Sequence, residues 1–279
     1  MNVAIQGQAG SFHDKARKQL FAYSDALECK TFGDVFEAVS KSRAEYGIVA
    51  IENSLYGSIN EVYSLLLDKK LWICGEVYLH VQFALMASTG ADITGIKEIT
   101  SHPIALAECS KYLVKNLPDA NLINADDTAK AAKDVAESGD MTRAAIADPA
   151  LAEHHGLTIL AKSIENDSKN YTRFIIIQKD KQQPAAANKH SVILKLPERP
   201  GTLHEALGFF ADRKINLTKL ESHPVPGKVW EYIFYVDFES SLAQSKEVIK
   251  ALEADGATVT ILGSYTKSDP LGKFSESKS

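Results

Sequence analysis

The chain has 279 residues, of which 45% are hydrophobic and 24% charged, and its formal net charge is -5. This length predicts about two globular domains, each with enough apolar residues to bury a core without a metal or a disulfide. Lysine and arginine are scattered, which excludes a clustered basic surface for nucleic acid. No apolar run reaches about 18 residues, which excludes a transmembrane helix.

Short apolar runs alternate with helical patterns through the first 180 residues. Strands are predicted at 3–5, 26–32, 46–51, 98–101, 120–125, 143–147, 158–164 and 173–178, and helices at 11–21, 34–44, 59–67, 105–117, 128–137 and 149–155. Two strand-like runs within 71–88 have no helix between them, so we expect a crossover into a second lobe near 75–85 and a return near 170–178. The alternation predicts mostly parallel sheets with helices on both faces, and a ligand cleft between two lobes.

A second pattern follows the polar segment 179–189, which is typical of a linker. Strands at 190–196, 216–223, 230–238 and 258–262, with helices at 201–213 and 242–254, give the βαββαβ order of a ferredoxin-like domain. Residues 266–279 are polar and are predicted to fray. We therefore expect domains at 1–180 and 190–266.

A glycine turn, Gly7-Gln8-Ala9-Gly10, opens the first helix, with Ser11 as its predicted N-cap and Asp14 at capping-box spacing. Free N–H groups at such a helix start suit an anion. The turn lacks the GxGxxG pattern of dinucleotide sites. Taken alone, such a glycine turn is more often an ordinary feature of the fold.

Two more loops with polar side chains end predicted strands. Glu52-Asn53-Ser54 leaves a buried strand, where a carboxylate is costly unless it is paired or near solvent. A helix cap that involves Ser58 and Glu61 is the alternative. Ser101-His102-Pro103 places a titratable imidazole before a helix, although a lone histidine at a strand end is more often structural.

The fourth loop runs Asn170-Tyr171-Thr172-Arg173-Phe174 into the last strand of the first region. Arg173 carries a forked cation that suits a carboxylate, and Thr172 carries a hydroxyl beside it. A buried arginine in a strand is unexpected, and a buried Arg–Glu pair in the core is the alternative.

Several kinds of site are not expected. The three cysteines, Cys29, Cys74 and Cys109, are far apart and predict neither a disulfide framework nor a metal knuckle. No GxSxG, HExxH or Walker pattern occurs, which favours chemistry without metal, nucleotide or covalent intermediate. The start of the chain has no secretory leader pattern, so we expect a cytoplasmic protein.

Taken in order, these blocks resemble the prephenate dehydratase family. The matching blocks are the glycine turn, Ile51-Glu52-Asn53-Ser54 with Gly57-Ser58, Ser101-His102-Pro103, Asp127-Thr128-Ala129 with Ala131-Ala132, and Asn170 with Thr172-Arg173-Phe174. The C-terminal blocks Arg199-Pro200-Gly201-Thr202-Leu203, Asn216-Leu217-Thr218-Lys219 and Glu221-Ser222-His223-Pro224 are similar to an ACT regulatory domain. Each block alone is weak, but the full set in this order is specific.

The resemblance implies an α/β fold with a bilobal, periplasmic-binding-protein-like catalytic region and a ferredoxin-like ACT domain. It implies that prephenate, a dianion, loses carbon dioxide and water to give phenylpyruvate, without a cofactor or metal. By resemblance, Thr172, Glu52, Asn53, Ser101 and His102 are catalytic, and Thr172 assists the departing hydroxyl. Arg173, Phe174, Ser11, Phe12, Ser54, Asn170 and Thr128 then bind the substrate.

The ACT resemblance implies that phenylalanine inhibits a homodimer or homotetramer. The effector residues would be Pro200, Gly201, Thr202, Leu203, Asn216, Leu217, Glu221 and Ser222. Ile104 and Glu108 stand where the family often has glutamine, and His223 stands where it usually has arginine. Glu108 would place a carboxylate near an anionic substrate unless it is protonated, paired or turned away.

Two other functions fit the same sequence. An arogenate dehydratase performs the same elimination on an amino acid, and the blocks above do not separate it from a prephenate dehydratase. A non-catalytic sensor that binds a dicarboxylate in the cleft is the third reading, which the Thr172-Arg173 pair argues against.

Overall fold

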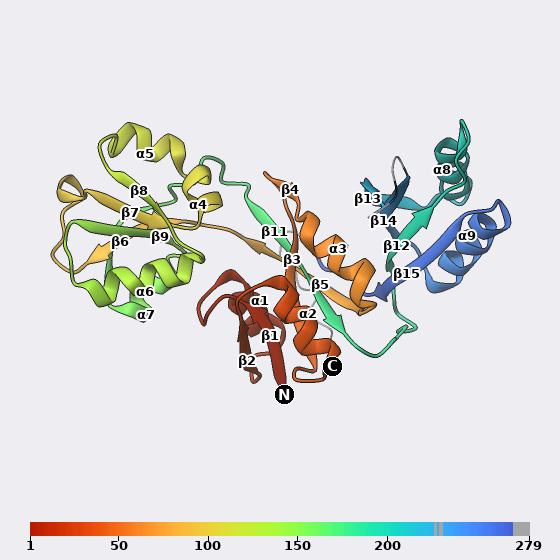
Figure 1. The fold of residues 1–279 in the computed structure, drawn as a ribbon, viewed down its shortest axis with the longest axis horizontal. Helices are drawn as coiled ribbons and strands as arrows, with labels where there is room; N and C mark the ends of the chain where they lie inside the picture. The colour runs from red at the N-terminus through yellow and green to blue at the C-terminus, as the bar shows by residue number, and fades with distance from the viewer. Residues whose placement is uncertain (226–227, 229–230, 270–279) are drawn as a thin grey trace. The chain divides into compact units, whose positions relative to one another are not determined.

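A computed structural model describes residues 1–225, 228 and 231–269 of the chain (Figure 1). It divides into two compact units, Met1–Tyr63 with Val77–Phe174, and Ser64–Glu76 with Ile175–Ser279. The expected domain limits of 1–180 and 190–266 stay a prediction. The predicted strand at 230–238, the turn before it and the polar end of the chain lie partly outside the described residues.

The first lobe is built on parallel strands. β1 (Asn2–Gln6) lies between β2 (Asp25–Cys29) and β3 (Tyr46–Asn53), and β4 (Gly57–Ser58) folds back antiparallel on β3. β11 (Tyr171–Gln178) follows on the other side of β3. The first lobe also contains α1 (Phe12–Leu20) and α2 (Phe32–Ser40). Two further elements, α3 (Asn60–Lys69) and β5 (Trp72–His80), each have one end in one compact unit and the other end in the other unit. Val3, Ala4 and Ile5 are fully buried, as expected for a central strand covered on both faces.

The second lobe has its own five-stranded sheet, and it is mixed rather than parallel. Its strand order is β10 (Leu157–Lys162), β6 (Ala84–Ser88), β9 (Arg143–Ala147), β7 (Glu98–Ser101) and β8 (Asn121–Asn124). β7 runs parallel to β8 and β9, whereas β6 runs antiparallel to β9 and β10. The expectation of mostly parallel sheets therefore fails here, because β6 enters the lobe directly from β5 without a crossover helix.

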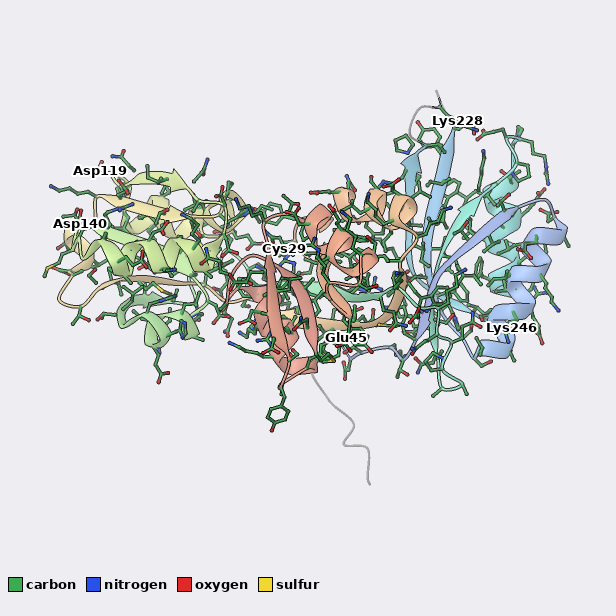
Figure 2. The ribbon with its side chains drawn as sticks, turned by 60° about the horizontal axis from the view of Figure 1, so that its bottom comes forward. Cys29, Glu45, Asp119, Asp140, Lys228 and Lys246 are labelled. Atoms are coloured by element: carbon green, nitrogen blue, oxygen red, sulfur yellow. The ribbon has the colours of Figure 1, made fainter. Side chains whose placement is uncertain are left out.

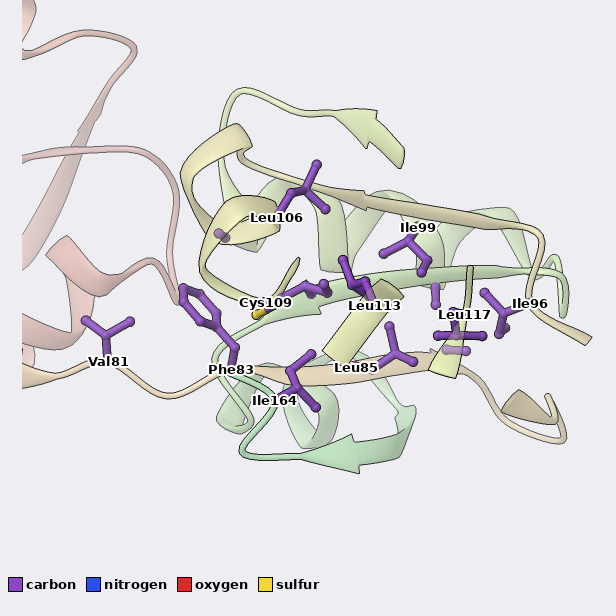
Figure 3. Packing of buried hydrophobic residues seen from close by; sticks show 14 residues of the cluster. Val81, Phe83, Leu85, Ile96, Ile99, Leu106, Cys109, Leu113, Leu117 and Ile164 are labelled. Carbon is purple, nitrogen blue, oxygen red and sulfur yellow. The ribbon is translucent and has the colours of Figure 1, made fainter. Parts of the chain in front are cut away.

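Helices bury two separate cores against this sheet. α4 (Pro103–Glu108) and α5 (Ser110–Asn116) cover one face, where Phe83, Leu85 and Ile99 meet Leu106 and Leu113 (Figure 3). α6 (Thr128–Ser138) and α7 (Ala150–His155) cover the other with small alanine side chains. In the compact unit that contains both lobes, charged side chains such as Glu45, Asp119 and Asp140 are exposed on the surface (Figure 2).

The predicted helix at 105–117 is two helices, which meet at Cys109. Asn166, distant in sequence, accounts for the break: its Nδ2 donates to the Ala107 carbonyl at 3.0 Å, and its Oδ1 accepts from the Lys111 N–H at 2.9 Å. One side chain thus satisfies a carbonyl at the end of α4 and an amide at the start of α5. The predicted strand at 26–32 also ends early, at Cys29, because Thr31 and Asp34 form the capping box of α2.

The C-terminal elements form an antiparallel sheet with two helices. The chain order is β12 (Lys189–Lys195), α8 (Thr202–Asp212), β13 (Asn216–Pro224), β14 (Tyr232–Glu239), α9 (Leu242–Ala254) and β15 (Thr258–Tyr265). The strands are ordered β13-β14-β12-β15, and their apolar side chains pack with those of α8 and α9 around Phe210 and Phe238. This is the predicted ferredoxin-like βαββαβ arrangement.

Candidate active site

A cavity of about 540 Å³ lies in the first compact unit, with walls from both lobes. Its apolar wall includes Phe12, Phe32, Val81, Phe83 and Phe174, so a ring can be enclosed there. Its polar wall consists of Gln6, Ser11, His13, Asn53, Tyr56, Ser58, His102, Glu108, Asp126, Asp127, Thr128 and Thr172. Of the predicted site residues, Ser11, Phe12, Asn53, His102, Thr128, Thr172 and Phe174 therefore meet at one cavity.

The glycine turn meets the start of α6 at this cavity. Gly7 has a φ of +89°, and a Cβ added to it would lie 2.1 Å from Asp127 Oδ2, so only glycine fits. Asp127 caps α6, because its Oδ1 accepts from the Ala129 and Lys130 N–H groups at 2.5 and 3.2 Å. This contact places the turn of the first lobe directly against a helix start of the second.

The predicted capping box of α1 is only half formed. Ser11 Oγ accepts from the Asp14 N–H at 3.3 Å, as predicted. The Asp14 carboxylate, however, accepts from the Gly10 N–H at 2.8 Å rather than from Ser11. Asp14 is buried and also pairs with Arg17 at 2.7 Å and Lys18 at 2.9 Å, so it anchors the glycine turn.

Thr172 is held by an amide pair at the mouth of β11. Asn53 Oδ1 accepts from the Leu55 and Tyr56 N–H groups at 2.8 and 3.0 Å, which fixes the orientation of the amide. Its Nδ2 then donates to Asn170 Oδ1 at 2.7 Å and to Thr172 Oγ1 at 3.1 Å. Since Thr172 accepts here, its own hydroxyl proton is available for a group in the cavity.

Arg173 lies elsewhere. Successive side chains of a strand point to opposite faces, and the cavity wall contains Thr172 and Phe174 but not Arg173. The Arg173 side chain is 5% exposed, and its Nη1 lies 3.8 Å from Glu52 Oε2. The sequence left open a buried Arg–Glu pair in the core: the pair is present, but the Glu52 side chain is 36% exposed, and neither partner lines the cavity.

Three more predicted residues support the site from behind its wall. Ser101 is fully buried, and its Oγ donates to the Ile146 carbonyl at 2.6 Å. Ser54 ties the end of β3 to β11, because its Oγ accepts from the Tyr171 N–H at 2.9 Å. Asn170 is fully buried behind Asn53. Ser58 pairs with Glu52 in the hairpin of β3 and β4, and the helix cap that involves Ser58 and Glu61 stays a prediction.

Two histidines in the wall are uncharged donors or acceptors. Burial lowers the pKa of His13 to about 3, and its Nε2 accepts from the Ala50 N–H at 3.2 Å. Burial also lowers the pKa of His102, although the Asp127 and Asp126 carboxylates oppose the shift. His102 Nδ1 accepts from the Ile104 N–H at 3.3 Å, which leaves its Nε2 as the donor. His13 was not predicted; its position in the first turn of α1 was the only local signal.

Glu108, the last residue of α4, also lines the cavity and is 4% exposed. Burial and, to a smaller extent, the Glu165 carboxylate raise its pKa to about 7, although the Asn170 amide opposes the rise. The sequence left open whether this carboxyl is protonated, paired or turned away. It faces the cavity, and no ion pair in the described structure includes it.

Backbone N–H groups, rather than side-chain cations, are the anion-binding groups that the described wall of this cavity offers. No lysine or arginine is among the described residues of its wall. The first residues of α1 and α6 contribute Phe12, His13 and Thr128 to the wall, and helix starts carry free N–H groups and partial positive charge. The cavity therefore suits a compact, aromatic-sized anion.

A second group of predicted residues lies around the start of α8. Gly201 is its N-cap with a φ of +91°, and an added Cβ would meet nothing closer than 3.9 Å, so conformation rather than space requires glycine. Pro200, Thr202 and Leu203 flank it on the same turn. Asn216 and Leu217 begin β13, and further along the strand Glu221 pairs with Lys219 at 3.0 Å and with His223 at 3.3 Å, next to Ser222.

No cluster of three or more His, Cys, Asp or Glu side chains among the described residues has the spacing of a metal site. None of the helices described is both long and apolar enough to span a membrane.

Comparison with known proteins accounts for this arrangement. The family model described as prephenate dehydratase matches residues 3–182, and the ACT domain model matches residues 190–257. The chain belongs to the prephenate dehydratase family. The prephenate dehydratase of Methanocaldococcus jannaschii is 40% identical over 92% of this chain and 94% of its own. Arogenate dehydratase/prephenate dehydratase 2 of Arabidopsis thaliana is 38% identical over 95% of this chain and 72% of its own.

Solved structures share the fold of this family member. A prephenate dehydratase from Arthrobacter aurescens in complex with L-Phe is 28% identical, with a TM-score of 0.84 over 97% of this chain and 91% of its own. A protein described as the quorum-quenching acylase GqqA is 30% identical, with a TM-score of 0.85 over 96% of this chain and 98% of its own. The predicted α/β class, with a bilobal region and a C-terminal ACT domain, is confirmed.

Proposed function

We propose that this chain is a prephenate dehydratase, which converts prephenate to phenylpyruvate, carbon dioxide and water. The observation that carries the proposal is Thr172, whose hydroxyl lines an aromatic cavity and accepts from Asn53 Nδ2 at 3.1 Å. A group held in this way donates its proton into the cavity. Family membership supplies the substrate class.

The reaction requires three things of the site. As the ring carboxylate leaves as carbon dioxide, its bonding electron pair completes the aromatic ring and expels the hydroxyl group. The enzyme must hold a dianion, enclose the ring and stabilise the departing oxygen. We assign the dianion to the N–H groups at the starts of α1 and α6, and the ring to the phenylalanine side chains of the wall. Thr172 then stabilises the departing oxygen.

The threonine hydroxyl is a weak acid, so we assign it a hydrogen bond to the departing oxygen rather than complete proton transfer. His102 is held with Nε2 as its donor on the same wall and adds a second neutral donor. Glu52 and Arg173 position the β3–β4 hairpin from outside the cavity. Direct binding of a substrate carboxylate by Arg173 stays a prediction.

Steady-state kinetics with Thr172→Ala and Thr172→Ser test the proposal. Loss of a donor aimed at developing charge costs about 10²–10³-fold in kcat, so the alanine variant should fall by that factor. The serine variant keeps the hydroxyl and should retain most of the turnover. Circular dichroism confirms that both variants are folded. Unchanged kcat in Thr172→Ala, or no prephenate turnover by the wild type, would contradict the proposal.

Arogenate is the second candidate substrate, because several relatives of this chain are named arogenate dehydratases. Parallel measurement of kcat/KM for prephenate and arogenate decides between them. We expect prephenate to be preferred, because the family model that matches most of this chain is that of prephenate dehydratase. A higher kcat/KM for arogenate would reassign the substrate.

We also infer that L-phenylalanine regulates the enzyme through the ACT domain. This rests on the match to that domain, on the Gly201 turn and on the relative solved with L-Phe. Pro200, Thr202, Leu203, Asn216, Leu217, Glu221 and Ser222 are the proposed contacts. A homodimer or homotetramer, a cytoplasmic location and independence from a cofactor remain predictions.

A further inference from the structure

Glu108 is a buried acid at the wall of the proposed substrate cavity. It ends α4, is 4% exposed and lines the cavity with Thr172, Asn53 and His102. Its Oε1 is buried and accepts no hydrogen bond from any residue that the structure describes. A carboxylate in such a place loses its hydration, and the Asn170 amide compensates for this loss only in part.

The groups that face Glu108 do not neutralise a negative charge. Glu165, from the segment between β10 and β11, and Tyr56, from the turn between β3 and β4, both interact with it electrostatically. Cys109 follows it in the chain, and Asn170 offers only a neutral amide. Glu165 is itself held in place, because its Oε2 accepts from the Phe83 N–H at 3.0 Å. Within the described residues, Glu108 therefore has an acid and neutral groups beside it and no cation.

The other titratable groups of the cavity wall are His13, His102, Asp126 and Asp127. Burial lowers the pKa of both histidines, so neither supplies a cation at neutral pH. Asp127 uses its carboxylate to cap α6. A substrate with two carboxylates thus enters a cavity whose described wall has no lysine or arginine, and Glu108 is the buried acid there with no cation beside it.

Two like charges in a dry cavity repel strongly, and one of them is then protonated. A protonated carboxyl is a hydrogen-bond donor, whereas a carboxylate is only an acceptor. We propose that Glu108 holds the anionic substrate as a neutral carboxylic acid that donates a hydrogen bond to it, and that binding above neutral pH draws one proton from solvent. This inference rests on the proposed function for its substrate.

The sign of the pH dependence follows from the free enzyme. Its Glu108 pKa is raised to about 7 by burial. Below that pH the carboxyl is already protonated, and binding requires no proton. Above it the free enzyme is ionised, and kcat/KM should fall about tenfold per pH unit. If Glu108 instead bound the substrate as a carboxylate, kcat/KM would rise as the pH increased through the pKa of Glu108.

Glu108→Gln is the direct test, because glutamine keeps the shape and an N–H donor but does not titrate. We expect kcat/KM for prephenate to decline above about pH 7 in the wild type and to be independent of pH over that range in the variant. Glu165→Gln is the matched control. It removes a charge that raises the Glu108 pKa, so the decline should begin at a lower pH. If Glu108→Gln does not fold, Glu165→Gln still tests the proposal: a decline in kcat/KM that begins at the same pH as in the wild type would contradict it.

Proton uptake provides a readout that does not depend on turnover. Calorimetric titration with phenylpyruvate at pH 8, in two buffers of different ionisation enthalpy, counts the protons taken up. The wild type should take up close to one proton and Glu108→Gln none. Turnover of prephenate with identical pH profiles in wild type and Glu108→Gln overturns this inference and leaves the function intact. Proton uptake without prephenate turnover contradicts only the function.

Discussion

At the scale of single residues, the alternation of side chains along β11 decides which of them reach the cavity. Thr172 and Phe174 face the cavity, whereas Arg173 lies 3.8 Å from Glu52 outside it. Arg173 is buried and Glu52 is partly exposed, so the guanidinium draws the carboxylate toward the body of the lobe. The cation that looked most like a substrate ligand is thus placed to hold the hairpin that carries Asn53.

A double-mutant cycle tests this supporting role. Arg173→Lys and Glu52→Gln should each lower kcat/KM, and the double variant should lose less than the sum of the two. The interaction energy should be about 1–2 kcal/mol, as found for residues in one hydrogen-bonded or ion-paired network. Strictly additive losses, with KM rising only in Arg173→Lys, would instead indicate that Arg173 binds the substrate directly.

At the scale of elements, the start of α1 depends on a buried ion pair. Burial works against a charge on Asp14, but the Gly10 N–H, Lys18 and Arg17 together hold its pKa below the usual value. Arg17 Nη1 also donates to Ser24 Oγ at 2.9 Å, which joins the helix to the segment before β2. The ion pairs of Asp14 with Arg17 and Lys18 therefore hold in place the helix start that faces the cavity.

We predict that Asp14→Ala lowers the free energy of unfolding by about 3 kcal/mol at pH 7, because it leaves Arg17 buried without its partner. A lowered carboxyl pKa stabilises the fold above the unfolded value and loses this effect as pH falls through the folded pKa. The difference from wild type should therefore narrow below about pH 4. Urea unfolding across pH measures it.

The control for this prediction is Asp134→Ala, which removes an exposed i,i+4 pair with Lys130. That variant should cost no more than about 0.5 kcal/mol. Equal losses in the two variants would contradict the importance of the buried network.

At the scale of the whole molecule, the ACT elements and the cavity lie in different compact units. The second unit includes Ser64–Glu76, so the end of α3 and the start of β5 belong with the C-terminal elements. Within that unit, Lys189 Nζ pairs with Glu76 Oε2 at 2.8 Å, and both side chains are almost completely buried. A segment of the catalytic region is thus bound firmly to the first strand of the ACT domain.

Inhibition by L-phenylalanine should therefore be measured on the intact chain, which contains both the cavity and the ACT elements. We expect millimolar L-phenylalanine to lower prephenate turnover, and Gly201→Ala to weaken this response, because alanine rarely adopts a φ of +91°. Sedimentation should give a dimer or a tetramer. A monomer whose activity L-phenylalanine does not change would contradict both the assembly and the effector.

The sequence by itself determined the family, the order of the elements and the polar loops, because these depend on residue periodicity and on motifs within a few neighbouring residues. Ser11, Thr128 and Thr172 were found in this way, and strand alternation alone would also have separated Arg173 from Thr172. Only the tertiary structure decided the break at Cys109, which Asn166 stabilises from 55 residues or more along the chain. It likewise decided that Ser101 is buried against the Ile146 carbonyl and that Glu108 faces the cavity, because burial depends on which distant segments pack against a side chain.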